Sequence, residues 1–433
     1  MKYLEGIKYL ATILQEQAWM LAVDGKLYSQ EKGPQGFEAR ELGSIQGILA
    51  GLLMSLQTLG KELTLADIKK IHEACMKGIK SQNPCQPGEF RTNPVAFEVL
   101  ATWFSESGLQ HLLRNMHETA HLIPVSEALH NNVPVLISQL SNKKNLKLVV
   151  RLEKAIKPGI DQNSLNKIIQ EVQKENIKLI YRPPAAEFIS KELGVITDNY
   201  NEKIKGATDP QQIVLIIAET IQAYTRLHPF RDGNNRTFVN ILLNRLLIEN
   251  GLKPAIFFEP NVFEFKTPQE LTEVINNAQQ QFEAIIKNSR QPVFGYDNSR
   301  TKTLESGKFI KLGDFFLNEL NKLVHNMGRQ FNQSKQPQLA KECFKLNYEL
   351  TVKLLGEKHV NAGIALFSLA SITEDPQEAL QYYSKSLTIF KQIKRDDLCS
   401  KAQEKIKSLE EVLSSGSTEG SEAKMSAERT YQM

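Results

Sequence analysis

The sequence contains few cysteines, and their spacing excludes some classes of protein. Four cysteines occur in 433 residues, with no Cys-x-x-Cys pair. This pattern argues against a disulfide framework and against a thiolate zinc site. The amino terminus mixes charges among its apolar positions, unlike a secretory signal peptide. We therefore expect a reducing compartment, the cytoplasm.

Strong charge and long apolar runs are also absent. The formal net charge is only +4, and no basic tract is interleaved with aromatic residues, so nucleic acid is not an expected partner. The most apolar run, residues 43–60, is interrupted by Gln46, Ser55 and Gln57 and is too short to span a bilayer. We expect it to be a buried helix, with no membrane span in the chain.

What the sequence does contain is helical periodicity, which predicts an all-α fold. Thr64 followed by Asp67 indicates a capping box, and Asp209 followed by Pro210 marks a second helix start. The segment 238–251 is apolar nearly all round and ends at a glycine, as expected for a central helix. Prolines break the pattern near residue 84, and an extended or hairpin-like stretch is predicted to follow.

The stretch HPFRDGNNRT, residues 228–237, lies between two such helices. Gly233 permits a tight turn, and the N-terminus of the next helix favours a bound phosphate. Arg236 and Asn234 offer further donors to an anion. Asp232 suits Mg²⁺, and His228 is the obvious base. Together these residues provide the parts for phosphoryl or nucleotidyl transfer.

This stretch resembles the signature HxFx(D/E)GNGRxxR of the Fic family. The matching positions are His228, Phe230, Asp232, Gly233, Asn234 and Arg236. Upstream, GEFRTNPV at 88–95 resembles the Fic flap, a β-hairpin over the active site that docks the target; its candidate docking residues are Gly88, Glu89, Phe90, Arg91 and Thr92. YRPPAAEF at 181–188 resembles the proline pair before a Fic core helix.

The resemblance implies a protein adenylyltransferase that uses Mg²⁺ and ATP. His228 would deprotonate a Ser, Thr or Tyr hydroxyl of a target protein, and Asp232 would hold the metal. The donor phosphates would be bound by Gly233, Asn234, Asn235 and Arg236.

Two departures from the signature leave the donor open. Asn235 replaces the second motif glycine, and Val239 replaces the final arginine. In the Doc branch of the family, a non-glycine residue at the first of these places accompanies phosphate transfer. Another branch transfers phosphocholine from a CDP-linked donor. A catalytically weak Fic scaffold that acts as a binding module is the alternative from a different class.

A second motif, MHETAHLI at 116–123, matches HExxH. On a helix, His117 and His121 would share a face and could bind zinc, with Glu118 as a base. A third ligand would have to come from Glu127 or His130. The competing interpretation is two ordinary histidines on a helix.

The expected layout is a Fic core at 1–260 with a helical insertion at about 98–176, a helical connector at 261–335, repeats at 336–412 and a disordered tail at 413–433. The insertion is expected to lie beside the flap and to help select the target. The repeats place Ala340 and Ala379 thirty-nine residues apart after a shared Pro-Gln, a period typical of stacked helical hairpins.

The repeats resemble tetratricopeptide (TPR) hairpins, which implies a groove for a peptide or protein. A Fic core joined to such repeats and a Ser/Glu-rich tail resembles a bacterial type IV effector. That resemblance implies secretion into the cytosol of a host cell.

Overall fold

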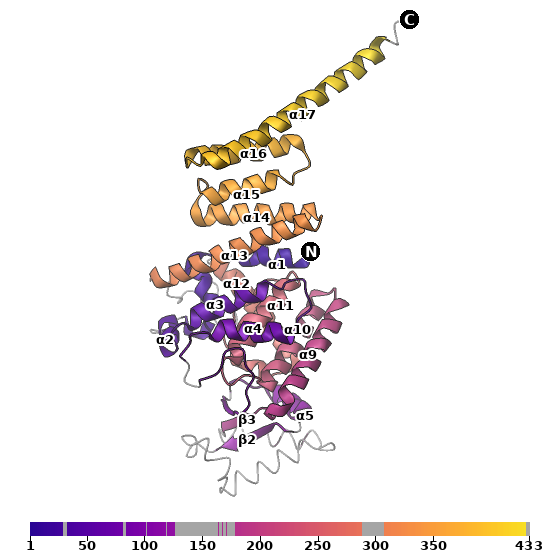
Figure 1. Cartoon of the computed structure of the whole chain (residues 1–433). Helices are drawn as coiled ribbons and strands as arrows, with labels where there is room; N and C mark the ends of the chain where they lie inside the picture. The colour runs from indigo at the N-terminus through magenta and orange to yellow at the C-terminus, as the bar shows by residue number, and fades with distance from the viewer. Residues whose placement is uncertain are drawn as a thin grey trace. The chain divides into compact units, whose positions relative to one another are not determined.

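The structure, a computed structural model, is helical throughout most of its length (Figure 1). It describes residues 1–28, 33–80, 84–100, 102–117, 119–125, 163, 167, 170, 178–287 and 307–429. Two compact units divide the chain, Lys2–Leu312 and Gly313–Met433. The predicted all-α fold class is confirmed.

The N-terminal unit contains α-helices and several short helical turns. The α-helices are α1 (Lys2–Ala11), α2 (Gly33–Arg40), α3 (Ser44–Leu56), α4 (Leu65–Met76), α5 (Glu106–Asn115), α9 (Ile189–Lys205), α10 (Pro210–Leu227), α11 (Leu243–Glu249) and α12 (Pro268–Ile286). The 3₁₀ turns are η1 (Gln15–Leu21), η2 (Gly25–Leu27), η4 (Ala186–Phe188) and η6 (Pro260–Phe265), and η5 (Arg236–Leu242) is a π-helix.

The predicted helix starts are confirmed by their cap geometry. Thr64 accepts a hydrogen bond from the Asp67 amide at 3.2 Å, and the Asp67 carboxylate accepts one from the Thr64 amide at 3.0 Å. The Asp209 carboxylate likewise accepts from the Gln212 amide at 2.8 Å, at the start of α10. Each such cap is worth about 1 kcal/mol.

The apolar run at 43–60 forms α3, which packs closely against α4. A Cβ on Gly47 would lie 2.3 Å from the carbonyl oxygen of Cys75, so only glycine allows the two helices to approach this closely. In the described part of the chain, no helix combines the length and apolarity needed to cross a bilayer. The predicted buried helix is confirmed.

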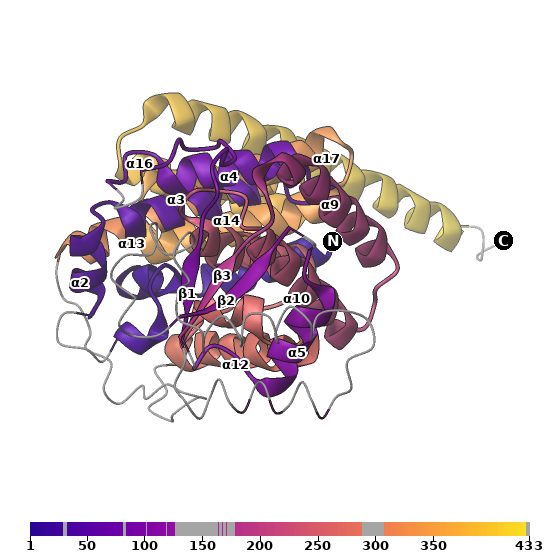
Figure 2. The same cartoon turned by 90° about the horizontal axis from the view of Figure 1, so that it is seen from below.

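A small antiparallel sheet lies at one end of the N-terminal unit, and Figure 2 shows its three strands side by side. Its strands are β1 (Phe97–Val99), β2 (His121–Val125) and β3 (Lys178–Arg182), in the order β1-β3-β2. The expected hairpin within 88–95 is corrected: those residues begin in a turn and form no strand, and β1 just beyond them pairs with β3. Long-range pairing of this kind leaves no local sequence signal.

The insertion predicted at 98–176 is also only partly helical. Its described part contains β2 and the end of β1 besides α5, and most of 126–177 lies outside the described residues. The side chains of this part have their own core, in which Leu109, Leu112, Leu179 and Phe265 are buried. The insertion is therefore joined to the rest of the unit through β3 and η6.

The HExxH stretch does not lie on a helix, contrary to the sequence prediction. Helix α5 ends at Asn115, and His121 is the first residue of β2. His117 hydrogen-bonds Thr119 at 2.9 Å and packs on Phe188. No group of three metal-ligating side chains occurs among the described residues; Glu118, Glu127 and His130 lie outside them.

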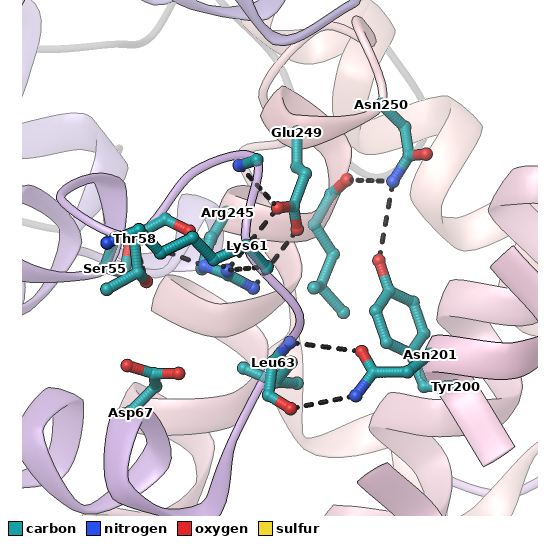
Figure 3. A network of polar contacts seen from close by, with 12 residues as sticks. Ser55, Thr58, Lys61, Leu63, Asp67, Tyr200, Asn201, Arg245, Glu249 and Asn250 are labelled. Atoms are coloured by element: carbon teal, nitrogen blue, oxygen red, sulfur yellow. Dashed lines mark hydrogen bonds and ion pairs between the residues drawn. The ribbon is translucent and has the colours of Figure 1, made fainter. Parts of the chain in front are cut away.

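A buried arginine joins α11 to the segment between α3 and α4 (Figure 3). Arg245 donates to the carbonyls of Ser55 and Thr58 at 3.2 and 3.3 Å and pairs with Glu249 at 3.2 Å. Glu249 also accepts from the Gly60 amide at 3.0 Å. This network ties the helix that follows the motif to the neighbouring segment, because the carbonyls and the Glu249 carboxylate offset the cost of burying the guanidinium.

The C-terminal unit consists of helical hairpins. Its helices are α13 (Gly307–Gln333), α14 (Pro337–Leu355), α15 (Val360–Ala370), α16 (Pro376–Gln392) and α17 (Asp396–Arg429). Ala340 in α14 and Ala379 in α16 are both buried, at equivalent places of successive hairpins. The repeat inferred from their spacing therefore corresponds to a structural period.

Two predicted boundaries differ from the structure. The connector predicted at 261–335 is not a single element: η6 and α12 pack on α10 in the N-terminal unit, and the division between the two units falls within α13, after Leu312. Helix α17 extends to Arg429, into the tail predicted to be disordered. Ser, Glu, Ala and Lys there tolerate a helix without needing a core of their own.

Candidate active site

The Fic motif forms a tight loop between α10 and η5. His228 ends α10 with a left-handed backbone (φ 50°), and Gly233 has φ 73°. A Cβ at Gly233 would lie 2.5 Å from the Met76 sulfur. Conformation and close packing therefore both require glycine at this point of the loop.

Two motif residues close this loop from inside. Phe230 is fully buried. The Asn234 side chain accepts from the Phe230 amide at 3.0 Å and donates to the Phe230 carbonyl at 2.8 Å. The predicted role of this side chain as an anion donor is therefore corrected, because both ends of its amide are engaged in holding the loop.

His72 of α4 supports the loop from below and was not identified from the sequence. Its ring stacks on Phe230 with centroids 3.7 Å apart. Its Nδ1 accepts from the Gly88 amide at 2.8 Å, so Nε2 carries the proton and donates to the Asp232 carbonyl at 3.1 Å. Burial lowers the pKa of His72 to about 4, which keeps this neutral tautomer at physiological pH.

Two cavities meet at the motif. The larger has a volume of about 600 Å³ and extends toward residues 93–98, and the smaller has about 250 Å³ and reaches Arg236. The residues that line both are His228, Asp232, Asn235 and Asn261. The predicted base and the predicted metal ligand thus lie at the junction of the two cavities.

His228 is half-buried and neutral at physiological pH. Burial, with a smaller effect of the nearby Arg91 guanidinium, lowers its pKa to about 3, and the Thr225 carbonyl acts in the opposite direction. The imidazole packs against the Phe97 ring with centroids 4.7 Å apart. A neutral imidazole between the cavities is able to accept a proton from an incoming hydroxyl.

Arg236 lines the smaller cavity and is already engaged by the chain's own groups. Its guanidinium forms an ion pair with Glu41 and donates to the Met76 sulfur at 3.4 Å. Asp24 lines the same cavity, and burial raises the pKa of its carboxyl to about 6. An anion that binds Arg236 here must compete with Glu41.

Asn235, at the place of the second motif glycine, donates to the Asn261 side chain of η6. Its Oδ1 is buried and has no hydrogen-bond partner within the described ranges. Val239, at the place of the final arginine, is fully buried in the π-helix. The smaller cavity is therefore narrowed at one position and lacks a second arginine from the motif.

The flap-like segment is fastened to the loop by Arg91. This side chain is buried, and its guanidinium donates to four carbonyls, those of His228, Asn93, Pro184 and Leu227. The Arg91 side chain thus holds the backbone around the loop, and the docking of a target by this residue stays a prediction. Its hydrogen bond to the Pro184 carbonyl links the flap-like segment to the proline pair at 183–184.

The other flap residues differ in their accessibility. Gly88 is buried, and its amide is used by His72. Glu89 is exposed and pairs with Lys69 at 3.3 Å, and Phe90 packs against Phe230. Thr92 is exposed and, with Glu89, remains a candidate for contact with a target.

Several residues at the site carry no motif and come from distant segments. Trp103, Arg182, Asn261 and Glu264 line the larger cavity, and Asp24 and Glu41 lie by Arg236. They are brought to the loop only by tertiary packing.

Comparison with known proteins agrees with this geometry. Residues 143–247 match the sequence profile described as Fic, Fic/DOC family. This segment contains the motif at 228–237, so the resemblance predicted from the motif is confirmed.

A curated relative is the phosphocholine transferase AnkX of Legionella pneumophila subsp. pneumophila (strain Philadelphia 1). It is 30% identical over 343 residues, which cover 74% of this chain and 35% of the relative. The chain therefore spans about a third of the length of the curated relative that it matches.

Proposed function

We propose that the N-terminal unit transfers phosphocholine from CDP-choline to a hydroxyl of a target protein. The observation that carries this proposal is the junction of two cavities at His228 and Asp232. In CDP-choline, the diphosphate joins a cytidine to a choline. Such a donor would place one of these groups in each cavity and its diphosphate at the junction. The relative of this chain named as a phosphocholine transferase supports the same transferred group.

In this reaction, the neutral His228 imidazole accepts the proton of the target hydroxyl. The acceptor oxygen forms a bond to the choline-bearing phosphorus, and the bond from that phosphorus to the CMP oxygen breaks. The products are a phosphocholine ester on the target and CMP. The loop amides and Arg236 stabilise the charge of the departing phosphate once Glu41 is displaced.

Mg²⁺ commonly binds through one or two carboxylates together with substrate phosphates. Asp232 lines both cavities, and Asp24 lines the smaller one. These two carboxylates fit the ligands that Mg²⁺ commonly uses. When bound there, Mg²⁺ would neutralise phosphate charge. Asp232 is held in place by its own contact with the Gly233 amide at 2.7 Å and by His72.

AMP transfer from ATP, the first expectation from the motif, is the competing reaction. The same base and anion-binding loop would serve it. Asn235 and Val239 speak against it, because they narrow the smaller cavity and remove the second arginine from the place where a terminal phosphate would bind.

The test uses the full chain, a host-cell lysate and labelled CDP-choline, ATP, CTP or UTP, with His228→Ala as the control. We expect an adduct with the mass of phosphocholine that depends on CDP-choline and on His228. An AMP adduct would replace the proposal with adenylylation. The absence of any His228-dependent adduct would favour a binding module.

For the C-terminal unit we infer a peptide-binding role. A cavity of about 390 Å³ is lined by Asn321, Lys322, His325, Asn326, Asn347, Asn361 and Ile364. Amide side chains suit the backbone of an extended peptide. Asn326→Ala, at an exposed position of this cavity, should weaken capture of the target without changing CDP-choline turnover, which separate binding and hydrolysis assays would show.

The target is expected in the cytosol of a host cell, where a secreted effector would act. The likeness of the repeats and the Ser/Glu-rich tail to effector architecture supports this location. Fusion of the full chain to a translocation reporter in a secretion-competent bacterium would test it, with a secretion-deficient strain as the control.

A further inference from the structure

Several unsatisfied polar atoms gather in the larger cavity. Trp103 Nε1, Asn235 Oδ1 and Glu264 Oε2 are all buried and have no hydrogen-bond partner in the part of the chain that is described. All three residues line this one cavity. Buried polar groups are almost always paired, so their common location indicates a ligand that completes them.

Glu264 is the most informative of these residues. It is only 2% exposed, and its carboxylate accepts a hydrogen bond from the residue's own backbone amide. Burial raises its pKa to about 7, despite the opposing effect of Arg226. Arg226 uses its Nε to donate to the Glu264 carbonyl at 2.9 Å, so it acts on the backbone rather than on Oε2.

A buried carboxylate without a cation is costly, and this cost is removed when a ligand brings the cation. Aromatic side chains beside the carboxylate restrict the kind of cation. Phe97 and Trp103 line the same cavity, and aromatic rings bind alkylammonium groups such as choline well. Glu98 adds a second carboxylate to the lining.

The position relative to His228 fits a short linker. The Phe97 ring lies against the His228 ring, with centroids 4.7 Å apart, so the aromatic surface begins next to the reacting centre. In phosphocholine only two carbons separate the phosphate ester from the ammonium group. Arg182 and Arg231 also line the cavity and can pair with phosphate oxygens at the other end of the same zwitterion.

We propose that Glu264, Trp103 and Phe97 form a subsite for the ammonium head of the transferred group, and that Glu264 selects donors by this positive charge. This assignment rests on the proposed function and specifies how its donor is recognised. It makes the larger cavity the place of the head group and leaves the smaller cavity to the nucleotide.

The decisive comparison uses CDP-choline and its neutral isostere, CDP-3,3-dimethylbutanol, in which carbon replaces the ammonium nitrogen. Calorimetry on the full chain should show wild-type protein binding CDP-choline at least about tenfold more tightly than the isostere. Glu264→Gln should reduce this preference to less than about threefold while CDP itself binds unchanged. CDP-ethanolamine reports whether the methyl groups add to the charge.

Control variants show whether the effect belongs to Glu264. Glu98→Gln makes the same charge change in the same cavity at a half-buried position, and should retain most of the preference. Trp103→Phe should keep the fold and reduce the preference in part. Unchanged CDP affinity and a single cooperative thermal transition show that each variant is folded.

The outcomes separate the two proposals. If wild-type protein transfers phosphocholine but does not discriminate against the isostere, the subsite is wrong and the proposed function stands. Retained preference in Glu264→Gln, or equal loss in Glu98→Gln, would also overturn the assignment. If neither CDP-choline nor CDP binds and no phosphocholine is transferred, the proposed function itself fails.

Discussion

The two cavities at the Fic motif differ in how their charges are balanced. In the smaller one, the guanidinium of Arg236 is paired with Glu41. In the larger one, the Glu264 carboxylate is buried with an oxygen that lacks a partner in the described structure. The comparison teaches that the chain itself completes one cavity, whereas a ligand has to complete the other.

The largest effect is expected at His228, which lines both cavities, so its removal tests whether the two cavities serve one reaction. His228→Ala should reduce phosphocholine transfer at least ~10³-fold, because the base is lost. Donor affinity should stay within roughly threefold, since the imidazole acts on the acceptor. Single-turnover kinetics and calorimetry measure the two quantities, and an equal loss in both would contradict the assigned role.

The next prediction compares an arginine from each cavity. Arg236→Gln should lower the transfer rate by about 10²-fold, because Arg236 is positioned to stabilise the departing phosphate. Arg231→Gln, at an exposed position of the larger cavity, should cost less than about tenfold because solvent screens its charge. Comparable rates for the two variants would show that the smaller cavity does not hold the nucleotide phosphate.

Releasing the internal ion pair should sharpen the comparison further. Glu41→Gln removes the carboxylate that occupies Arg236, so CDP should bind roughly fivefold more tightly. Glu62→Gln is the matched control, because Glu62 forms an exposed pair with Lys205 at 2.7 Å. Weaker CDP binding in Glu41→Gln would mean that Glu41 orients Arg236 rather than competing for it.

The smallest effect concerns stability. The pKa of Glu264 is raised from 4.5 to about 7, so the folded state holds this proton more tightly than the unfolded state does. Its penalty is absent below pH 4.5 and grows as the pH rises to 7, reaching roughly 3 kcal/mol at most. Glu264→Gln should therefore raise the unfolding temperature at pH 8 and leave it nearly unchanged at pH 4.5.

The helices and the catalytic loop could be predicted from the sequence because their signals are local. The capping residues Thr64 and Asp209 mark the starts of α4 and α10. Gly233 and His228 lie where the spacing placed them, at the turn between two buried helices. The motif also led to the resemblance that the family profile bears out over 143–247, since its residues are contiguous.

The rest of the site depends on packing between distant segments. Glu264 reaches the larger cavity through η6, and Trp103 lies just after a strand that pairs some eighty residues later. Nothing near either residue in the sequence marks it as functional. Asn234 and Arg91 show the converse problem: their side chains could bind a ligand, and only the geometry shows that they hold the backbone.

The His72 ring touches both the beginning of the flap, at the Gly88 amide, and the catalytic loop, at the Asp232 carbonyl. A displacement of either backbone group has to be passed through this rigid imidazole to the other. The flap and the catalytic loop are therefore expected to move together. A donor that shifts Asp232 would also shift the flap surface that an arriving target protein contacts.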